Sequence, residues 1–236
     1  MTVNQILSSK GKEVYSVLST NTVFEALTIM SEKNIGAILV IEDTILKGIL
    51  SERDYARKIV SFLPSVSQFI LVGHSMGGYI ALEMASQFPE RIQKVVMLHS
   101  TFVADTEEKK INRDRTADLL DKKGTGFFIG PFLPNLFASA SPDLLATLAE
   151  RYRYLPASGL IAATKAMRDR KDFTTFVQTT EIPFLFILGE KDSLISPKSI
   201  TRFVKKSVVI LPNVGHQGTY EAPDAVAAAI NQFIYV

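Results

Sequence analysis

The chain has 236 residues, of which 26 are basic, 24 are acidic and none is cysteine. Near-neutral charge without a basic stripe argues against a nucleic-acid partner, and the lack of cysteine excludes disulfides, thiolate metal sites and a cysteine nucleophile. No apolar run reaches the roughly 18 residues of a membrane-spanning helix, and the N-terminus lacks the apolar stretch of a signal peptide. We expect one large or two small domains, a reducing cytoplasmic setting, and no metal or cofactor.

The first 50 residues predict a helix followed by a hairpin. Apolar side chains recur at helical spacing over residues 23–33, with Asn21 or Thr22 as the cap. Short apolar runs at 37–41 and 46–50 predict two antiparallel strands. The turn between them lacks glycine, so the sequence leaves its geometry open.

The rest of the chain alternates helices with buried strands. A serine and acidic residues open the run 51–60, which predicts a helix. An apolar strand at 68–72 precedes a helix at 78–88, which ends before a proline. Further elements follow the same alternation, with strands at 94–98, 183–188 and 208–212 and helices at 196–207 and 222–234. This pattern predicts a mostly parallel α/β sheet with helices on both faces.

Residues 101–180 carry no strand signal and predict a helical insertion, with helices that start near residues 141 and 158. Its apolar side chains either line an acyl pocket or pack on one another, and they are Phe127, Phe128, Ile129, Phe132, Leu133, Leu136 and Phe137.

The segment Gly73-His74-Ser75-Met76-Gly77 follows a strand and opens a helix, as a nucleophile elbow requires. Gly73 and Gly77 are expected to leave room in the tight turn. The Met76 backbone N–H then faces the space above Ser75 and serves as an oxyanion donor. The alternative is a glycine-rich turn whose serine only caps the helix.

Two loops offer partners for this serine. Asp192 follows the strand at 183–188 and His216 follows the strand at 208–212, so both reach the sheet edge that carries Ser75. Each residue alone is more often a solvated or capping side chain. The order Ser, Asp, His after successive strands indicates a catalytic triad. His74 is expected to pack structurally, and His99 to be a packed or hydrogen-bonded residue at the end of a core strand.

Residues 68–236 resemble the later part of an α/β-hydrolase enzyme, through "FILVGHSMGGYIALEMASQFPERIQKVVML", "IPFLFILGEKDSLIS" and "VGHQGTYEAPDAVAAAINQFI". The resemblance implies a serine hydrolase for small esters or related acyl compounds, with Ser75 as nucleophile, His216 as base and Asp192 as its orienting acid. It also implies that residues 101–180 form a helical cap. The family's first four strands and its His-Gly oxyanion loop have no counterpart, so we expect weak or absent turnover.

Residues 1–60 resemble a single cystathionine-β-synthase (CBS) domain, through "TNTVFEALTIMSEKNIGAILVIED" and "LKGILSERD". The resemblance implies a non-catalytic nucleotide-binding module in which Ser51 contacts phosphate and Asp54 the ribose hydroxyls. It also implies that two copies pair, which points to a homodimer. Alternatively, Ser51 caps a helix and Asp54 favours its N-terminal dipole.

The two resemblances abut without a linker, so we interpret the chain as a recombinant chimera. The predicted organisation is a CBS-like fragment at 1–60, a hydrolase core at 61–100 and 181–236, and the cap at 101–180. We expect one sheet, in which a right-handed β-α-β unit places strand 46–50 beside strand 68–72. Ser51 or Glu52 then lies near Ser75, where an anion or ester can bind.

Overall fold

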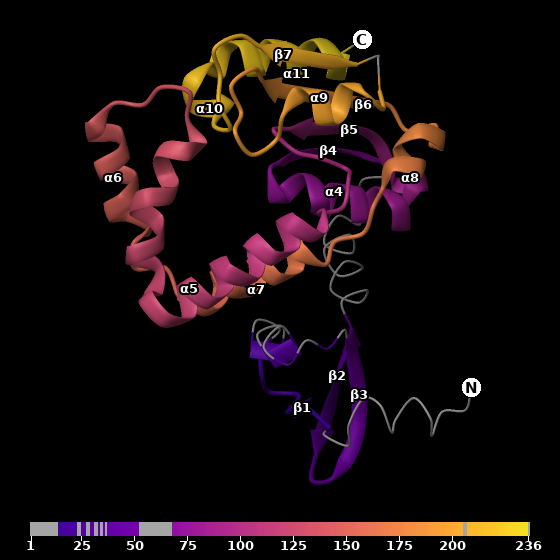
Figure 1. Ribbon diagram of the computed structural model, residues 1–236. Helices are drawn as coiled ribbons and strands as arrows, with labels where there is room; N and C mark the ends of the chain where they lie inside the picture. The colour runs from indigo at the N-terminus through magenta and orange to yellow at the C-terminus, as the bar shows by residue number, and fades with distance from the viewer. Residues whose placement is uncertain are drawn as a thin grey trace. The chain divides into compact units, whose positions relative to one another are not determined.

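A computed structural model describes residues 14–22, 25–26, 29–30, 33, 35, 37–51, 68–204 and 207–235 (Figure 1). The chain forms two compact units, residues 1–65 and 66–236. Asp54, Glu52 and the helix predicted at 51–60 lie outside the described residues, as does the side chain of Ser51. No helix in the described ranges is long and apolar enough to cross a bilayer.

The first unit contains a three-stranded sheet in the order β1-β2-β3. Strand β1 (Ser16–Val17) runs parallel to β2 (Ala37–Glu42), and β3 (Ile45–Ser51) runs antiparallel to β2. The predicted hairpin is therefore confirmed, whereas the two-residue β1 was not foreseen. In the turn between these two strands, Asp43 and Thr44 have φ of 47° and 67°. Positive φ at both central residues is typical of turns that match the twist of a hairpin, and neither residue here is glycine.

The helical turns of this unit begin at the predicted cap. Thr22 Oγ1 accepts a hydrogen bond from the Glu25 N–H at 3.2 Å, and the Glu25 carboxylate accepts one from the Thr22 N–H at 2.7 Å. This reciprocal pair is a capping box. The backbone hydrogen bond from Thr22 lowers the pKa of Glu25. A small core forms above the sheet from Val17, Ala26, Met30 and Ile38.

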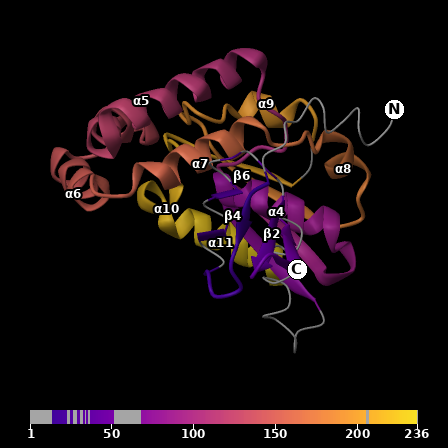
Figure 2. The same cartoon turned by 90° about the horizontal axis from the view of Figure 1, so that it is seen from below.

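The second unit contains a four-stranded parallel sheet in the order β4-β5-β6-β7 (Figures 1 and 2). Its strands are β4 (Phe69–His74), β5 (Ile92–Leu98), β6 (Phe184–Gly189) and β7 (Val208–Leu211). All six residues of β6 are buried, as expected of a central parallel strand covered on both faces. The predicted strands and their order are confirmed.

The expectation of one continuous sheet is wrong. Strand β3 pairs with β2, and the strands of the two units form separate sheets. The fragment at 1–60 therefore does not complete the hydrolase sheet, because its apolar strands pair with one another around their own core. Among the described residues, β4 pairs with β5 alone.

Helices cover the two faces of the parallel sheet. Helix α4 (Met76–Gln87) buries Ala81, Leu82 and Ala85 against one face. Helix α11 (Pro223–Tyr235) packs Val226 and its neighbours against the other. Shorter helices complete the connections, namely η1 (Pro89–Arg91), α9 (Pro197–Thr201) and α10 (Gly218–Glu221).

The helical insertion contains α5 (Glu107–Phe132), η2 (Leu133–Leu136), α6 (Pro142–Tyr152), α7 (Ala157–Arg168) and α8 (Thr174–Thr179). Helices α5 and α7 lie side by side in Figures 1 and 2. Of the predicted pocket residues, Ile129, Leu133 and Leu136 are buried in a cluster with α6. The cap side chains therefore pack on one another, which was the simpler of the two alternatives, while Phe127 is exposed.

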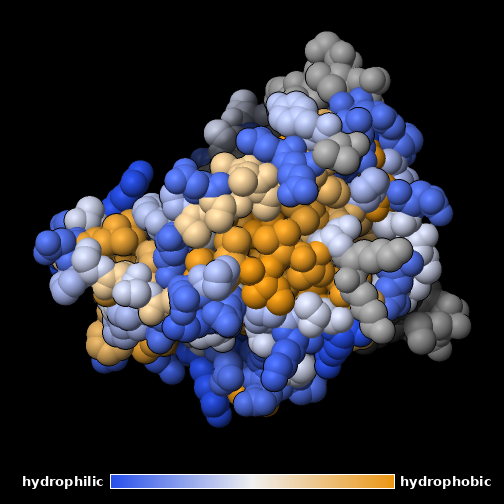
Figure 3. All heavy atoms as spheres, turned by 90° about the horizontal axis from the view of Figure 1, so that it is seen from above, coloured by the Kyte–Doolittle hydropathy of each residue, from blue (hydrophilic) through white to orange (hydrophobic). Residues whose placement is uncertain are grey.

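The surface keeps some apolar area uncovered. Val72, on the edge strand β4, is 51% exposed, and Figure 3 shows a contiguous apolar area on the face seen from above. Exposed apolar side chains on an edge strand favour pairing with another chain.

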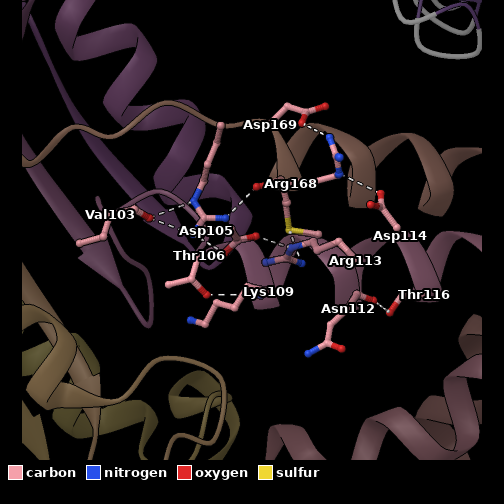
Figure 4. A network of polar contacts seen from close by, with 12 residues as sticks. Val103, Asp105, Thr106, Lys109, Asn112, Arg113, Asp114, Thr116, Arg168 and Asp169 are labelled. Carbon is pink, nitrogen blue, oxygen red and sulfur yellow. Dashed lines mark hydrogen bonds and ion pairs between the residues drawn. The ribbon is translucent and has the colours of Figure 1, made fainter.

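The cap is attached to the core by a buried carboxylate. Asp105, in the loop after β5, accepts hydrogen bonds from Arg113 Nε and Arg170 Nη2, both at 2.8 Å (Figure 4 shows Asp105 and Arg113). Arg113 belongs to α5, where the cap begins, and Arg170 follows α7, near its end. Arg170 also donates to the Val103 carbonyl and stacks 4.6 Å from the Tyr79 ring centre. One network therefore joins both ends of the cap to α4.

We predict that Asp105→Asn lowers the free energy of unfolding by about 2–3 kcal/mol at pH 7, because the substitution leaves two arginines around a neutral group. Burial raises the pKa of Asp105, but the two arginines outweigh it and lower the pKa overall. This stabilisation is therefore complete above the unfolded value near 3.9 and is lost as the pH falls through the lower folded value. Urea unfolding at pH 7 and in acid measures both effects.

The matched control is Asp114→Asn, because Asp114 is 52% exposed in its pair with Arg168. Its effect should stay below about 0.5 kcal/mol. Equal losses in the two variants would contradict a special role for Asp105.

Candidate active site

Strand β4 leads directly into Ser75, whose backbone is held in an unusual conformation. Ser75 has φ 52° and ψ −117°, a sparsely populated region for a residue with a Cβ. Its N–H donates to the Leu98 carbonyl at 2.9 Å, and its own carbonyl accepts from Ser100 Oγ at 2.7 Å. Hydrogen bonds from the end of β5 therefore fix the turn that projects the serine.

Glycine is needed on both sides of this turn. A Cβ at Gly73 would lie 2.4 Å from the Gly77 carbonyl oxygen, and one at Gly78 would lie 2.2 Å from Ser100 Oγ. At Gly77 no described atom comes within 4 Å of the corresponding position. The expectation for Gly73 is confirmed. The one for Gly77 is wrong, because the close approach of helix and strand occurs one residue later.

Ser75, His216 and Asp192 form a continuous chain of hydrogen bonds. His216 Nε2 lies 2.8 Å from Ser75 Oγ, and His216 Nδ1 lies 2.8 Å from Asp192 Oδ2. The other carboxylate oxygen, Oδ1, accepts from the backbone N–H groups of Leu194 and Ile195, each at 2.9 Å. The tertiary structure thus brings together the three side chains that the sequence placed at one sheet edge.

The charge of Asp192 fixes the proton positions along this chain. Burial raises the pKa of Asp192, but the hydrogen bonds from His216 and the Ile195 N–H, together with the nearby His99 ring, lower it well below its usual range. The ionised carboxylate can only accept, so His216 Nδ1 carries the proton that it donates to Asp192. His216 Nε2 then accepts from the Ser75 hydroxyl, which is the arrangement of a general base.

His74 links the serine turn to the histidine loop. Its Nε2 lies 2.9 Å from the His216 carbonyl oxygen, so the ring donates a proton there. Burial is the main cause that lowers the pKa of His74. The structural role expected for His74 is consistent with this contact.

The histidine loop is also attached to the cap. The His216 N–H donates to the Leu136 carbonyl at 2.8 Å. The Glu221 carboxylate accepts from the Gly215 N–H at 2.9 Å and from the Ala138 N–H at 2.7 Å. Sequence reasoning missed Glu221, as it did Ser100, because no local pattern marks a side chain whose partners lie about 80 or 25 residues away.

Met76 opens helix α4, where an α-helix offers its first N–H groups no acceptor. Its backbone is therefore available to an oxyanion beside Ser75. Ser51 belongs to the first unit, at the end of β3. Strands 46–50 and 68–72 are not neighbours in a sheet, so the expected shared edge is not formed.

Comparison with known proteins agrees with this fold. A family model described as "Alpha/beta hydrolase family" matches residues 47–229, and one described as "CBS domain" matches residues 5–61. The chain belongs to the α/β-hydrolase family and carries a CBS-domain segment near its N-terminus. Residues 47–61 fall within both matches.

Individual relatives match the chain over different lengths. The 2-(acetamidomethylene)succinate hydrolase of Mesorhizobium japonicum is 25% identical, over 93% of this chain and 86% of that protein. The mitochondrial CBS domain-containing protein CBSX3 of Arabidopsis thaliana is 36% identical, over 25% of this chain and 32% of that protein. A solved thermophilic esterase from Thermogutta terrifontis shares the fold, with a TM-score of 0.68 and 24% identity over 75% of this chain and 68% of that one.

We predict that Glu221→Ala lowers any Ser75-dependent hydrolytic rate by about tenfold, because small displacements of a catalytic group are costly. The substitution removes the acceptor that ties Gly215, next to His216, to the cap. The rate with a chromogenic ester and the thermal unfolding midpoint are measured together. Glu181→Ala, at an exposed position, is the control and should behave as the unaltered chain. A folded Glu221→Ala variant with full activity would refute this role.

Proposed function

We propose that residues 66–236 act as a serine hydrolase on small esters or related acyl compounds. The observation that carries this proposal is the chain Asp192–His216–Ser75, with 2.8 Å at each link. Its position at the carboxyl edge of a parallel sheet, above a strained strand-to-helix turn, supports the same role. The relative from Mesorhizobium japonicum is named as a hydrolase of an acylated small molecule, which is consistent with this substrate class.

In the proposed reaction, His216 Nε2 takes the Ser75 hydroxyl proton as Oγ attacks the carbonyl carbon. The carbonyl oxygen becomes an oxyanion, which the Met76 N–H stabilises. The intermediate collapses when the bond to the leaving alcohol breaks, and His216 returns its proton to that oxygen. Water then attacks the acyl-enzyme by the same route, which releases the acid and restores Ser75. Asp192 stays ionised throughout and stabilises the imidazolium.

We propose that turnover is weak. The sequence has no counterpart of the family's His-Gly segment, which leaves Met76 as the oxyanion donor identified at this site. Loss of one such donor costs about a hundredfold to a thousandfold in rate. The open pairing side of β4 among the described residues supports this view, since that side is where the missing strands belong in the family.

We predict that Ser75→Ala abolishes hydrolysis of p-nitrophenyl acetate above background and prevents labelling by a fluorophosphonate probe. The probe needs an activated serine oxygen, so it reports a competent site even when turnover is slow. Mass spectrometry of the digested, labelled protein should find the adduct on Ser75. Ser158→Ala, an exposed serine of α7, is the matched control and should label normally. An adduct on another serine, with Ser75 unmodified, would refute the assignment.

A second proposed function concerns the first unit. Similarity to a CBS domain supports an adenosine nucleotide site that uses Ser51 and Asp54. We expect titration calorimetry with AMP or ATP to show saturable heat that Asp54→Ala removes. Heat that persists unchanged in this variant would exclude the proposed contact.

We also propose that the chain is a recombinant chimera of a CBS-domain fragment and an α/β-hydrolase fragment. The matches to two different family models support this origin. The CBS-like segment, present once, is proposed to pair with its copy in a second chain and so to form a homodimer.

A further inference from the structure

His99 combines features that ordinary packing does not require. It follows β5, is completely buried, and has φ 45°, which is the left-handed region that residues other than glycine seldom adopt. The His99 N–H donates to the Ile187 carbonyl at 2.8 Å, so the backbone is fixed in this conformation. A strained, buried, polar residue at the end of a central strand points to a functional role.

The His99 ring is directed at the acid of the site. Nδ1 lies 3.4 Å from Asp192 Oδ2, the same oxygen that accepts from His216. Among the described residues, neither ring nitrogen of His99 has a partner with ordinary hydrogen-bond geometry. The distance between His99 Nδ1 and Asp192 Oδ2 is thus longer than that of an ordinary hydrogen bond.

The surrounding chain makes room for this imidazole. A Cβ at Gly218 would lie 2.2 Å from His99 Nε2, so glycine at that position permits the ring. An apolar side chain in place of His99 would avoid the cost of burying polar nitrogens. The combination of ring and adjoining glycine therefore needs a reason beyond packing, and Asp192 supplies it.

We propose that His99 is a positioning residue that acts through Asp192, by donating its Nδ1–H to Oδ2 and sharing that oxygen with His216. This inference rests on the proposed hydrolase function. The shared oxygen cannot rotate away from His216 without losing two donors. It also presents less negative charge to the His216 Nδ1–H.

Several other groups share this environment and affect its charge. The rings of His74, His99 and His216 lie within 5.3–6.0 Å of one another, measured between ring centres. Tyr79, on α4, also experiences the charge of Asp192. His74 and Tyr79 do not contact Asp192 Oδ2 in the way His99 does. A change at His99 should therefore alter the acid–base behaviour of the site more than it alters substrate binding.

The test compares His99→Leu with His99→Asn. Leucine removes the donor and keeps an apolar volume, whereas asparagine places an N–H near the position of Nδ1 and tolerates a positive φ. The pH dependence of kcat/KM for p-nitrophenyl acetate is measured, together with the pH dependence of inactivation by the fluorophosphonate. For His99→Leu we expect the acidic limb of the kcat/KM profile, where activity falls as the pH is lowered, to move to higher pH by about half a unit or more. We also expect kcat to fall and KM to stay constant. His99→Asn should restore the limb toward that of the unaltered chain.

An unshifted acid limb in a folded His99→Leu variant would overturn the proposal. A second measurement does not depend on turnover or on the variant's folding. Long-range ¹H–¹⁵N NMR of the unaltered chain should find a proton on His99 Nδ1, and Asp192→Asn should shift that resonance. An unprotonated Nδ1 on His99 would also overturn the proposal. Failure of the hydrolase function itself would be recognised separately, as absence of Ser75 labelling in the unaltered chain.

Discussion

The parallel alignment of β4, β5, β6 and β7 is the constraint on which the candidate site depends. Parallel strands share one carboxyl edge, and each is followed there by a loop. The loops after these strands carry Ser75, His99, Asp192 and His216 respectively. Residues that lie up to 141 positions apart in the sequence therefore meet within hydrogen-bond distance. Burial of apolar side chains on both faces holds the strands in this order.

The site concentrates polar groups in a buried region and satisfies most of them locally. Asp192 has a fully buried side chain, yet two backbone N–H groups and His216 donate to it. Such donors offset the cost of removing the charge from water and keep the carboxylate ionised. His99 is the exception, because its ring nitrogens lack partners of ordinary geometry among the described residues.

The cap is held to the core through polar contacts at two places. Asp105 joins the first helix of the insertion, α5, and the segment after α7 to the loop after β5. The Glu221 carboxylate joins the segment after η2 to the loop that carries His216. Both places adjoin loops of the candidate site. The cluster of Ile129, Leu133, Leu136 and Leu148 within the cap, by contrast, is apolar.

The sequence by itself determined the features that depend on neighbouring residues. These include the helix start at Asn21 or Thr22, the four parallel strands, and the strand–Ser75–helix turn, because periodicity and capping act over a few residues. The tertiary structure alone decided that β3 does not pair with β4, where the sequence favoured their union. It likewise assigned the close backbone approach to Gly78 rather than Gly77 and brought Glu221 to the histidine loop. These outcomes depend on which distant surfaces bury one another, and no local pattern of residues encodes that choice.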